Sequence, residues 1–175
     1  VVAWKISTMI ALSRPLVGGG FHAVQHLFAW DYYGHSMQVL DFIATPEPSA
    51  FPRAAHSIYF ETLGDLGFIG LALFLSLIFV SYRNARAVRR LAADRPDLRW
   101  AADLGHTLQT SLVAYTVAGA AVSVSYIDLL YILVAVSIRL RGIVVAETRV
   151  PVAAVRVPAR AEQAGLRPIG RPVLR

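Results

Sequence analysis

Cysteine is absent from the 175 residues of this chain. Its absence excludes a disulfide framework and any metal site built from thiolates. Charge is also scarce, since only 16% of the residues are Asp, Glu, Lys or Arg, whereas soluble domains carry roughly a quarter. The hydrophobic share is 56%. Such a chain has too few polar side chains to cover a soluble domain, and the composition predicts a membrane protein.

Three apolar stretches follow the first 65 residues and predict membrane-spanning helices. The segment 66–82 contains no charged residue, and at about 1.5 Å per residue it reaches roughly 25 Å, near the low end for crossing a bilayer core. The segment 105–125 is also uncharged and rich in small residues, which let helices approach closely in lipid. In the segment 126–145, Arg139 and Arg141 can snorkel to the surface. We therefore expect an all-α integral membrane protein with about three spans, forming the C-terminal portion of a larger multi-spanning bundle.

The distribution of charge predicts an orientation. Residues 83–99 hold six arginines against two aspartates, and residues 139–175 hold eight arginines against two glutamates. Residues 1–65 hold five acidic and three basic residues. By the positive-inside rule, the connector 83–104 and the tail 146–175 are expected in the cytoplasm and residues 1–65 outside, in the periplasm. Topology then explains the net charge of +6, and no nucleic-acid partner is expected.

The outer segment 1–65 is predicted to combine amphipathic helices with loops. Its apolar start favours a helix that ends before Arg14-Pro15, because proline disfavours helical geometry in the preceding residue. The run Gly18-Gly19-Gly20 permits a tight backbone path but lacks the Lys-Ser/Thr of a nucleotide-binding loop. The aromatic-rich part of 21–53 favours a short interfacial helix and a substrate rim. The tail, dominated by Val, Pro, Ala and Arg, is predicted to be disordered.

His56 is the strongest candidate for chemistry. It stands just ahead of the predicted span 66–82, on the outer side. An imidazole at a membrane surface can accept a proton near neutral pH from a substrate held by lipid. A histidine at such a place can equally be an ordinary interfacial residue, and local sequence leaves both interpretations open.

Three short motifs, in order along the chain, resemble one family. They are Arg14-Pro15-Leu16-Val17-Gly18-Gly19-Gly20-Phe21, His56-Ser57-Ile58-Tyr59-Phe60-Glu61 followed by Gly64, Gly67 and Gly70, and Ser125-Tyr126-Ile127-Asp128-Leu129-Leu130. Over about residues 1–145 the chain resembles the C-terminal part of the O-antigen ligase and polymerase superfamily. The motif sequences are most similar to those of the O-glycosylation ligases associated with exosortase A systems.

The resemblance implies a multi-pass glycosyltransferase of the bacterial inner membrane. Such an enzyme moves a glycan from undecaprenyl diphosphate to a lipid, protein or polysaccharide acceptor at the periplasmic face, with no metal or other cofactor, and its catalytic histidine corresponds to His56. The family usually has one arginine just ahead of the dipeptide matched by Ala3-Trp4 and another on an earlier span. The chain begins after both positions, so we expect it to be a fragment that is inactive alone. The alternative is a non-enzymatic membrane component, such as a polysaccharide transporter subunit.

Transfer from a glycosyl diphosphate also needs cations that offset charge on the leaving group. Arg53 and Arg14 are the candidates on the outer side, although a loop charge or a lipid headgroup contact explains each as simply. Glu61 is a candidate for capping or for positioning the acceptor, but its five-residue separation from His56 makes a direct pair unexpected.

The remaining polar residues have simpler explanations. Asp128 opens the third span, where the helix dipole favours an acid. The other outer histidines show no metal-ligand spacing, and His106 is expected on the cytoplasmic side. Sequence alone leaves the sugar, the acceptor, the choice between ligase and polymerase, and the oligomeric state undetermined.

Overall fold

The computed structural model describes residues 1–35, 39–40, 42–44 and 51–149 of the chain. Regular structure in these ranges is entirely helical. The α-helices are α1 (Val2–Ser13), α2 (Leu27–Gly34), α3 (Ile58–Leu91), α4 (Arg99–Gly119) and α5 (Asp128–Arg149), joined in part by two short 3₁₀ turns, Ala23–Gln25 and Pro96–Leu98. The all-α expectation is therefore confirmed for the described residues.

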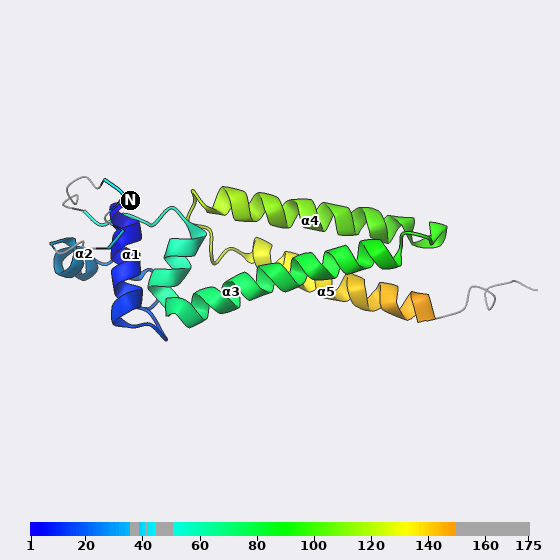
Figure 1. The fold of residues 1–175 in the computed structure, drawn as a ribbon, viewed down its shortest axis with the longest axis horizontal. Coiled ribbons are helices and arrows are strands. Elements are labelled where there is room, and N and C mark those ends of the chain that lie inside the picture. The colour runs from blue at the N-terminus through cyan, green and yellow to red at the C-terminus, as the bar shows by residue number, and fades with distance from the viewer. Residues whose placement is uncertain (36–38, 41, 45–50, 150–175) are drawn as a thin grey trace, which may run out of the picture.

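Helices α3, α4 and α5 lie side by side as an elongated bundle, and α1 lies across one end of it with α2 beyond (Figure 1). Two apolar cores correspond to these two parts. The bundle core gathers residues of all three long helices, among them Val88, Leu112 and Leu130. The smaller core lies between α1, α2 and the segment before α3, and includes Ile6 and Trp30.

Helix α3 changes direction near its start, so that its first turns run beside α1 and the rest runs along the bundle (Figure 1). The break is at Gly67, whose φ of 70° and ψ of −168° are not helical. The predicted span 66–82 therefore lies inside a longer helix. Within the segment 83–104, for which the sequence predicts a cytoplasmic connector, α3 continues to Leu91 and α4 begins at Arg99. Arginine and alanine favour helix, so the charge did not mark the helix end.

The other two predicted spans are displaced along the chain. Helix α4 ends at Gly119, so the last residues of the predicted segment 105–125 form a loop rather than a helix. Helix α5 begins at Asp128, in agreement with the predicted role of this residue at a helix start. Of the helices described, α3 and α5 are long and apolar enough to cross a membrane, whereas α4 does not meet that condition. The segment 150–175, which holds nearly all of the predicted tail, lies outside the described residues.

Much of the apolar surface of α3 and α5 faces outward. Only 33% of the most apolar window of α3, and 28% of that of α5, is buried inside the protein. The core helix of a soluble protein would bury most of such a surface, so this exposure favours lipid as the surroundings.

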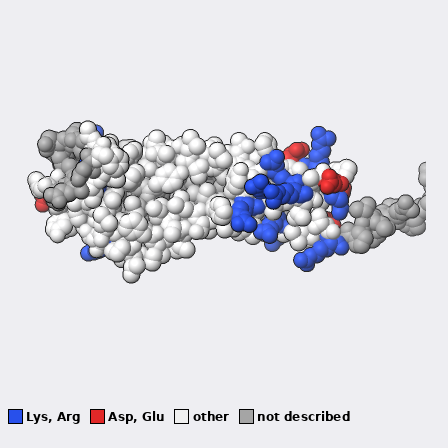
Figure 2. Space-filling view, viewed as in Figure 1, with Lys and Arg blue, Asp and Glu red and all other residues white. Residues whose placement is uncertain are grey.

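Charge gathers at one end of the bundle. Figure 2 shows Lys and Arg concentrated where α3 ends, α4 begins and α5 ends, and a middle region without charge on the face in view. We call this region, residues 83–99 and 139–149, the arginine end. The opposite region, formed by the first turns of α3 and the loop 120–127, contains Glu61 and Asp65, and we call it the carboxylate end.

Candidate functional site

The glycine loop of residues 14–20 is bonded to the break in α3. The Gly19 and Gly20 amides donate to the carbonyl oxygens of Gly64 and Asp65, both at 2.9 Å, and the Phe68 amide donates to the Pro15 carbonyl oxygen at 2.9 Å. A broken helix leaves carbonyl and amide groups without helical partners, which is costly away from water. The loop supplies those partners. Its amides thus bind the protein's own backbone, which explains the glycine run without a phosphate ligand.

Gly18 in the loop and Gly67 at the break cannot carry a side chain unless the neighbouring backbone shifts. A Cβ atom on Gly18 would lie 2.5 Å from the Asp65 carbonyl, and one on Gly67 would lie 2.6 Å from the Pro15 oxygen. Both residues also have a positive φ, 65° and 70°, which side chains disfavour. The loop and the break therefore fit together only because both sides lack a side chain.

Asp65 joins this loop to the α4–α5 connection. It is fully buried, and its carboxylate accepts hydrogen bonds from the His22 amide at 2.8 Å, the Ala23 amide at 2.9 Å and the Tyr126 hydroxyl at 2.9 Å. Burial raises the pKa of Tyr126, and the neighbouring Asp65 carboxylate adds to the rise. The phenol therefore stays protonated and remains a donor. A buried carboxylate with three donors fixes the segments that supply them.

Glu61, one helical turn before Asp65, binds Ser125, the residue before Tyr126 in the loop 120–127. Its Oε2 accepts a hydrogen bond from the Ser125 amide at 3.3 Å and lies 2.7 Å from the Ser125 hydroxyl. Glu61 is 3% exposed. Glu61 is a candidate for substrate binding from sequence, but its carboxylate faces the loop 120–127 inside the protein. The two acids, spaced by four residues on one helix face, thus bind two consecutive loop residues.

His56 lies where this loop meets the start of α3. Its backbone amide donates to the Ser123 Oγ at 2.9 Å, and its φ of 49° places it in the left-handed region. The flanking Ala55 and Ser57 are buried, whereas His56 is exposed. The Ala55 carbonyl accepts a hydrogen bond from the Trp4 Nε1 at 2.6 Å. The result is an accessible imidazole on a backbone that is held from both sides.

The two candidate arginines take separate positions. Arg14 is exposed and lines a cavity of about 360 Å³ that is bounded by α1, α2 and the glycine loop. Neither Arg53 nor His56 is among the residues that line it. Arg53 is exposed and lies three residues before His56. Arg53 is thus close to His56 along the chain, whereas Arg14 lines a cavity that His56 does not line.

The histidines offer no metal centre in the described part of the chain, where no three His, Cys, Asp or Glu side chains gather at ligand spacing. The Nδ1 of His22 is instead 3.1 Å from the Gln25 Nε2. His106 lies in α4, whose first residue, Arg99, belongs to the arginine end.

Sequence reasoning missed Asp65, Tyr126 and Ser123 as members of the site. Glu61 was predicted to cap a helix or to position the acceptor and Asp65 was considered only for its charge, although their four-residue spacing already put both on one helix face. Nothing local indicated that Ser123 reaches His56, because the contact joins positions 67 residues apart.

The exposed side chains that can exchange protons at this end of the molecule include the imidazoles of His56 and of His22, whose backbone amide binds Asp65. The buried acids have donors inside the protein and are not free to act on a substrate, so an exposed imidazole is the group suited to proton transfer with solvent. Comparison with protein-family models, with curated proteins and with solved structures finds no match to this chain.

Proposed function

We propose that this chain carries the catalytic histidine of a membrane glycosyltransferase, which transfers a glycan from undecaprenyl diphosphate to an acceptor at the periplasmic face of a bacterial inner membrane. The proposal combines the motif resemblance with the geometry of the carboxylate end. The observation that carries it is His56, exposed and in a left-handed backbone conformation that Ser123 helps to hold.

A residue in a sparsely populated conformation is retained where the surrounding structure over-determines it, and such residues cluster at functional sites. His22 shares a left-handed φ, 58°, and an amide bonded to a buried carboxylate, and the motif resemblance selects His56 between the two. The held backbone of His56 favours a role that depends on where its ring lies.

The chemistry assigned to His56 is that of a general base. An imidazole nitrogen takes the proton of the acceptor hydroxyl while the acceptor oxygen forms a bond to the anomeric carbon of the donor. The bond between that carbon and the diphosphate oxygen breaks, and undecaprenyl diphosphate leaves with the electron pair. Positive charge near the leaving oxygens lowers the barrier, and Arg53 is the described arginine nearest to His56 in sequence.

The alternative of a non-enzymatic transporter subunit has less support. Ionisable groups that line a transport path usually lie within the spans. Here the segment 66–82 of α3 has none, and Glu61 and Asp65 at its start are occupied by the loop 120–127.

The test compares His56→Ala and His56→Gln in the complete protein as its host expresses it. A positioned base contributes about 10² to 10⁴ in rate, so both variants should lose transfer while protein level and lipid-linked donor stay unchanged. Glutamine keeps a hydrogen-bonding side chain of similar reach but cannot take the proton.

The matched control is His106→Ala, which removes an exposed histidine from α4 and should leave transfer intact. Normal transfer by His56→Gln would reduce the role of His56 to positioning. Normal transfer by both His56 variants would remove this histidine from the active site.

A further inference from the structure

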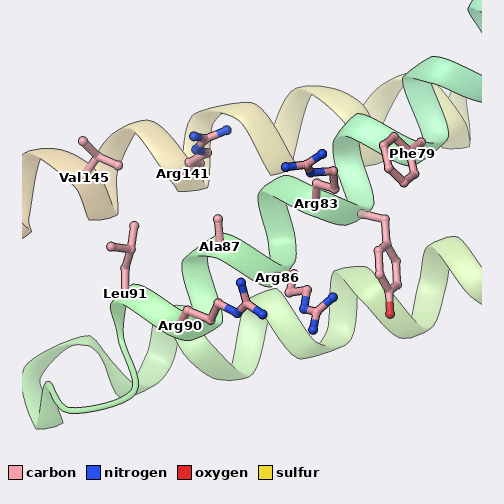
Figure 3. A pocket seen from close by; sticks show the side chains of 9 residues that line it. Phe79, Arg83, Arg86, Ala87, Arg90, Leu91, Arg141 and Val145 are labelled. Atoms are coloured by element: carbon pink, nitrogen blue, oxygen red, sulfur yellow. The ribbon is translucent and has the colours of Figure 1, made fainter.

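A basic groove of about 680 Å³ lies at the arginine end between α3 and α5 (Figure 3). Four arginines line it: Arg83, Arg86 and Arg90 from α3, and Arg141 from the facing α5. This groove is separate from the site around His56, and the proposed transfer reaction makes no use of it.

The α3 arginines share one face of their helix. Phe79, Arg83, Arg86 and Arg90 follow one another at steps of three and four residues, the spacing of neighbours on a helix surface. A different face packs against α4, where a Cβ on Gly105 would lie 3.0 Å from the Ala85 oxygen. The α3 arginines of the groove are therefore exposed side chains that the packing of α3 against α4 does not require.

Arg89, which also lies on α3, differs from the groove arginines because it contacts α4. Its Nη1 donates to the Gln109 Oε1 on α4 at 2.6 Å, and it does not line the groove. Within the groove, the Arg141 Nη1 donates to the buried Asn84 Oδ1 at 2.7 Å, which fixes this side chain across the two helices. Arg83 lies over the Phe79 ring with its Cζ 5.6 Å from the centroid. Two of the four guanidinium groups are thus already held in place.

Among the residues that the structure describes, no acidic side chain lines the groove. Among the described residues, the ion pair formed by an arginine of this end is Arg95–Asp97, outside the groove. Four positive groups around one groove repel one another unless an anion lies between them. Guanidinium groups match phosphate oxygens in geometry and bind them with charge-assisted hydrogen bonds.

The position of the groove selects the source of the phosphate. Phe79 and Tyr82, at one end of the groove, belong to the uncharged segment 66–82, and Arg83 is the first charged residue after it. The groove thus lies where the apolar surface of α3 meets its charged end. A phospholipid headgroup lies at this depth, with its acyl chains along the apolar surface, and basic pockets between spanning helices bind such headgroups.

We propose that the groove between α3 and α5 binds the phosphate of an anionic phospholipid headgroup at the membrane surface. Native mass spectrometry of the full chain in micelles with equal amounts of phosphatidylglycerol and phosphatidylcholine tests it. Phosphatidylglycerol should be retained preferentially, and excess inorganic phosphate should not displace it, because the acyl chains contribute to binding. Displacement by inorganic phosphate would overturn the lipid assignment.

The variant is Arg83→Gln/Arg86→Gln/Arg90→Gln, which keeps Arg141 and its bond to Asn84. Its matched control, Arg99→Gln/Arg139→Gln/Arg149→Gln, removes the same charge from exposed arginines outside the groove. Since each basic residue strengthens binding about fivefold, the groove variant should lose at least about tenfold in retained phosphatidylglycerol, and the control should keep it. An equal loss in both, or no loss in the groove variant, would contradict the proposal. Circular dichroism of both confirms folding.

Discussion

The two ends of the bundle differ in whether their charged side chains are buried or exposed. At the carboxylate end, Glu61 and Asp65 are buried and bonded to the loop 120–127. At the arginine end, the groove arginines are exposed, and the described lining of the groove contains no acidic residue. Buried and bonded charge fixes a structure, since a missing partner is costly there. Exposed charge contributes little to stability and is available for a membrane surface or a ligand.

This difference predicts that the two ends have different roles in the molecule. The carboxylate end holds one loop and, through Ser123, the backbone of His56. The arginine end is expected to set orientation by the positive-inside rule. Variants at the first end should therefore change stability and catalysis, whereas variants at the second should change lipid binding and topology.

The largest effect is expected from Gly18→Ala, because the added Cβ would lie 2.5 Å from the Asp65 carbonyl and the φ is positive. Strain and displacement together should cost about 3 kcal/mol or more, measured by thermal unfolding in detergent. Gly67→Ala should behave alike. The control is Gly142→Ala in α5, where nothing lies within 4 Å and where alanine should stabilise by up to about 1 kcal/mol. Equal stability of Gly18→Ala and Gly142→Ala would show that the loop and the break do not interlock.

The second effect concerns the bonded carboxylate. Tyr126→Phe removes one of the three donors to Asp65 and should cost about 1–2 kcal/mol in the free energy of unfolding. Asp65→Ala leaves two backbone amides without their acceptor and should cost about 3 kcal/mol or more. At the arginine end, Arg86→Gln should change stability by less than about 0.5 kcal/mol. A loss for Arg86→Gln as large as that for Tyr126→Phe would break the distinction between the two ends.

How much of this could be predicted from sequence depends on whether the signal is local. The helical class, the end of α1 before Arg14 and the start of α5 at Asp128 followed from composition, Pro15 and the helix dipole. The position of α4 did not, because small apolar residues are equally compatible with a helix and with the loop that follows Gly119. The uncharged segment ran through both, so charge gave no boundary.

The candidate site shows the same limit. His56 could be named as a candidate from sequence, because a histidine beside an apolar run has a recognisable chemistry and its motif resembles that of a known family. The surrounding contacts could not be named, because Ser123 and Tyr126 reach the start of α3 from a loop more than 60 residues away, and only folding brings them there. The break at Gly67 was also unforeseen, since its cause lies in the partners that the glycine loop provides.

At the carboxylate end, the smallest effect on stability is expected at Ser123. Ser123→Ala removes one exposed hydrogen bond and should cost no more than about 1 kcal/mol, yet it loosens the backbone of His56 and should lower transfer severalfold. Ser123→Thr keeps the hydroxyl and should restore transfer. The control Ser76→Ala removes a hydroxyl that donates to the Ala72 carbonyl in α3 and should leave transfer unchanged. Loss of transfer in both alanine variants would show that the effect is not specific to His56.

The central claim, that the two ends face opposite sides of a membrane, is tested most directly by single cysteines at Gln25 and Ala93. Both positions are exposed, and the chain contains no cysteine of its own. In intact cells an impermeant thiol reagent should label Gln25→Cys, and it should label Ala93→Cys only after the inner membrane is permeabilised. Labelling of Ala93→Cys in intact cells, at a rate equal to or above that of Gln25→Cys, would contradict the claim.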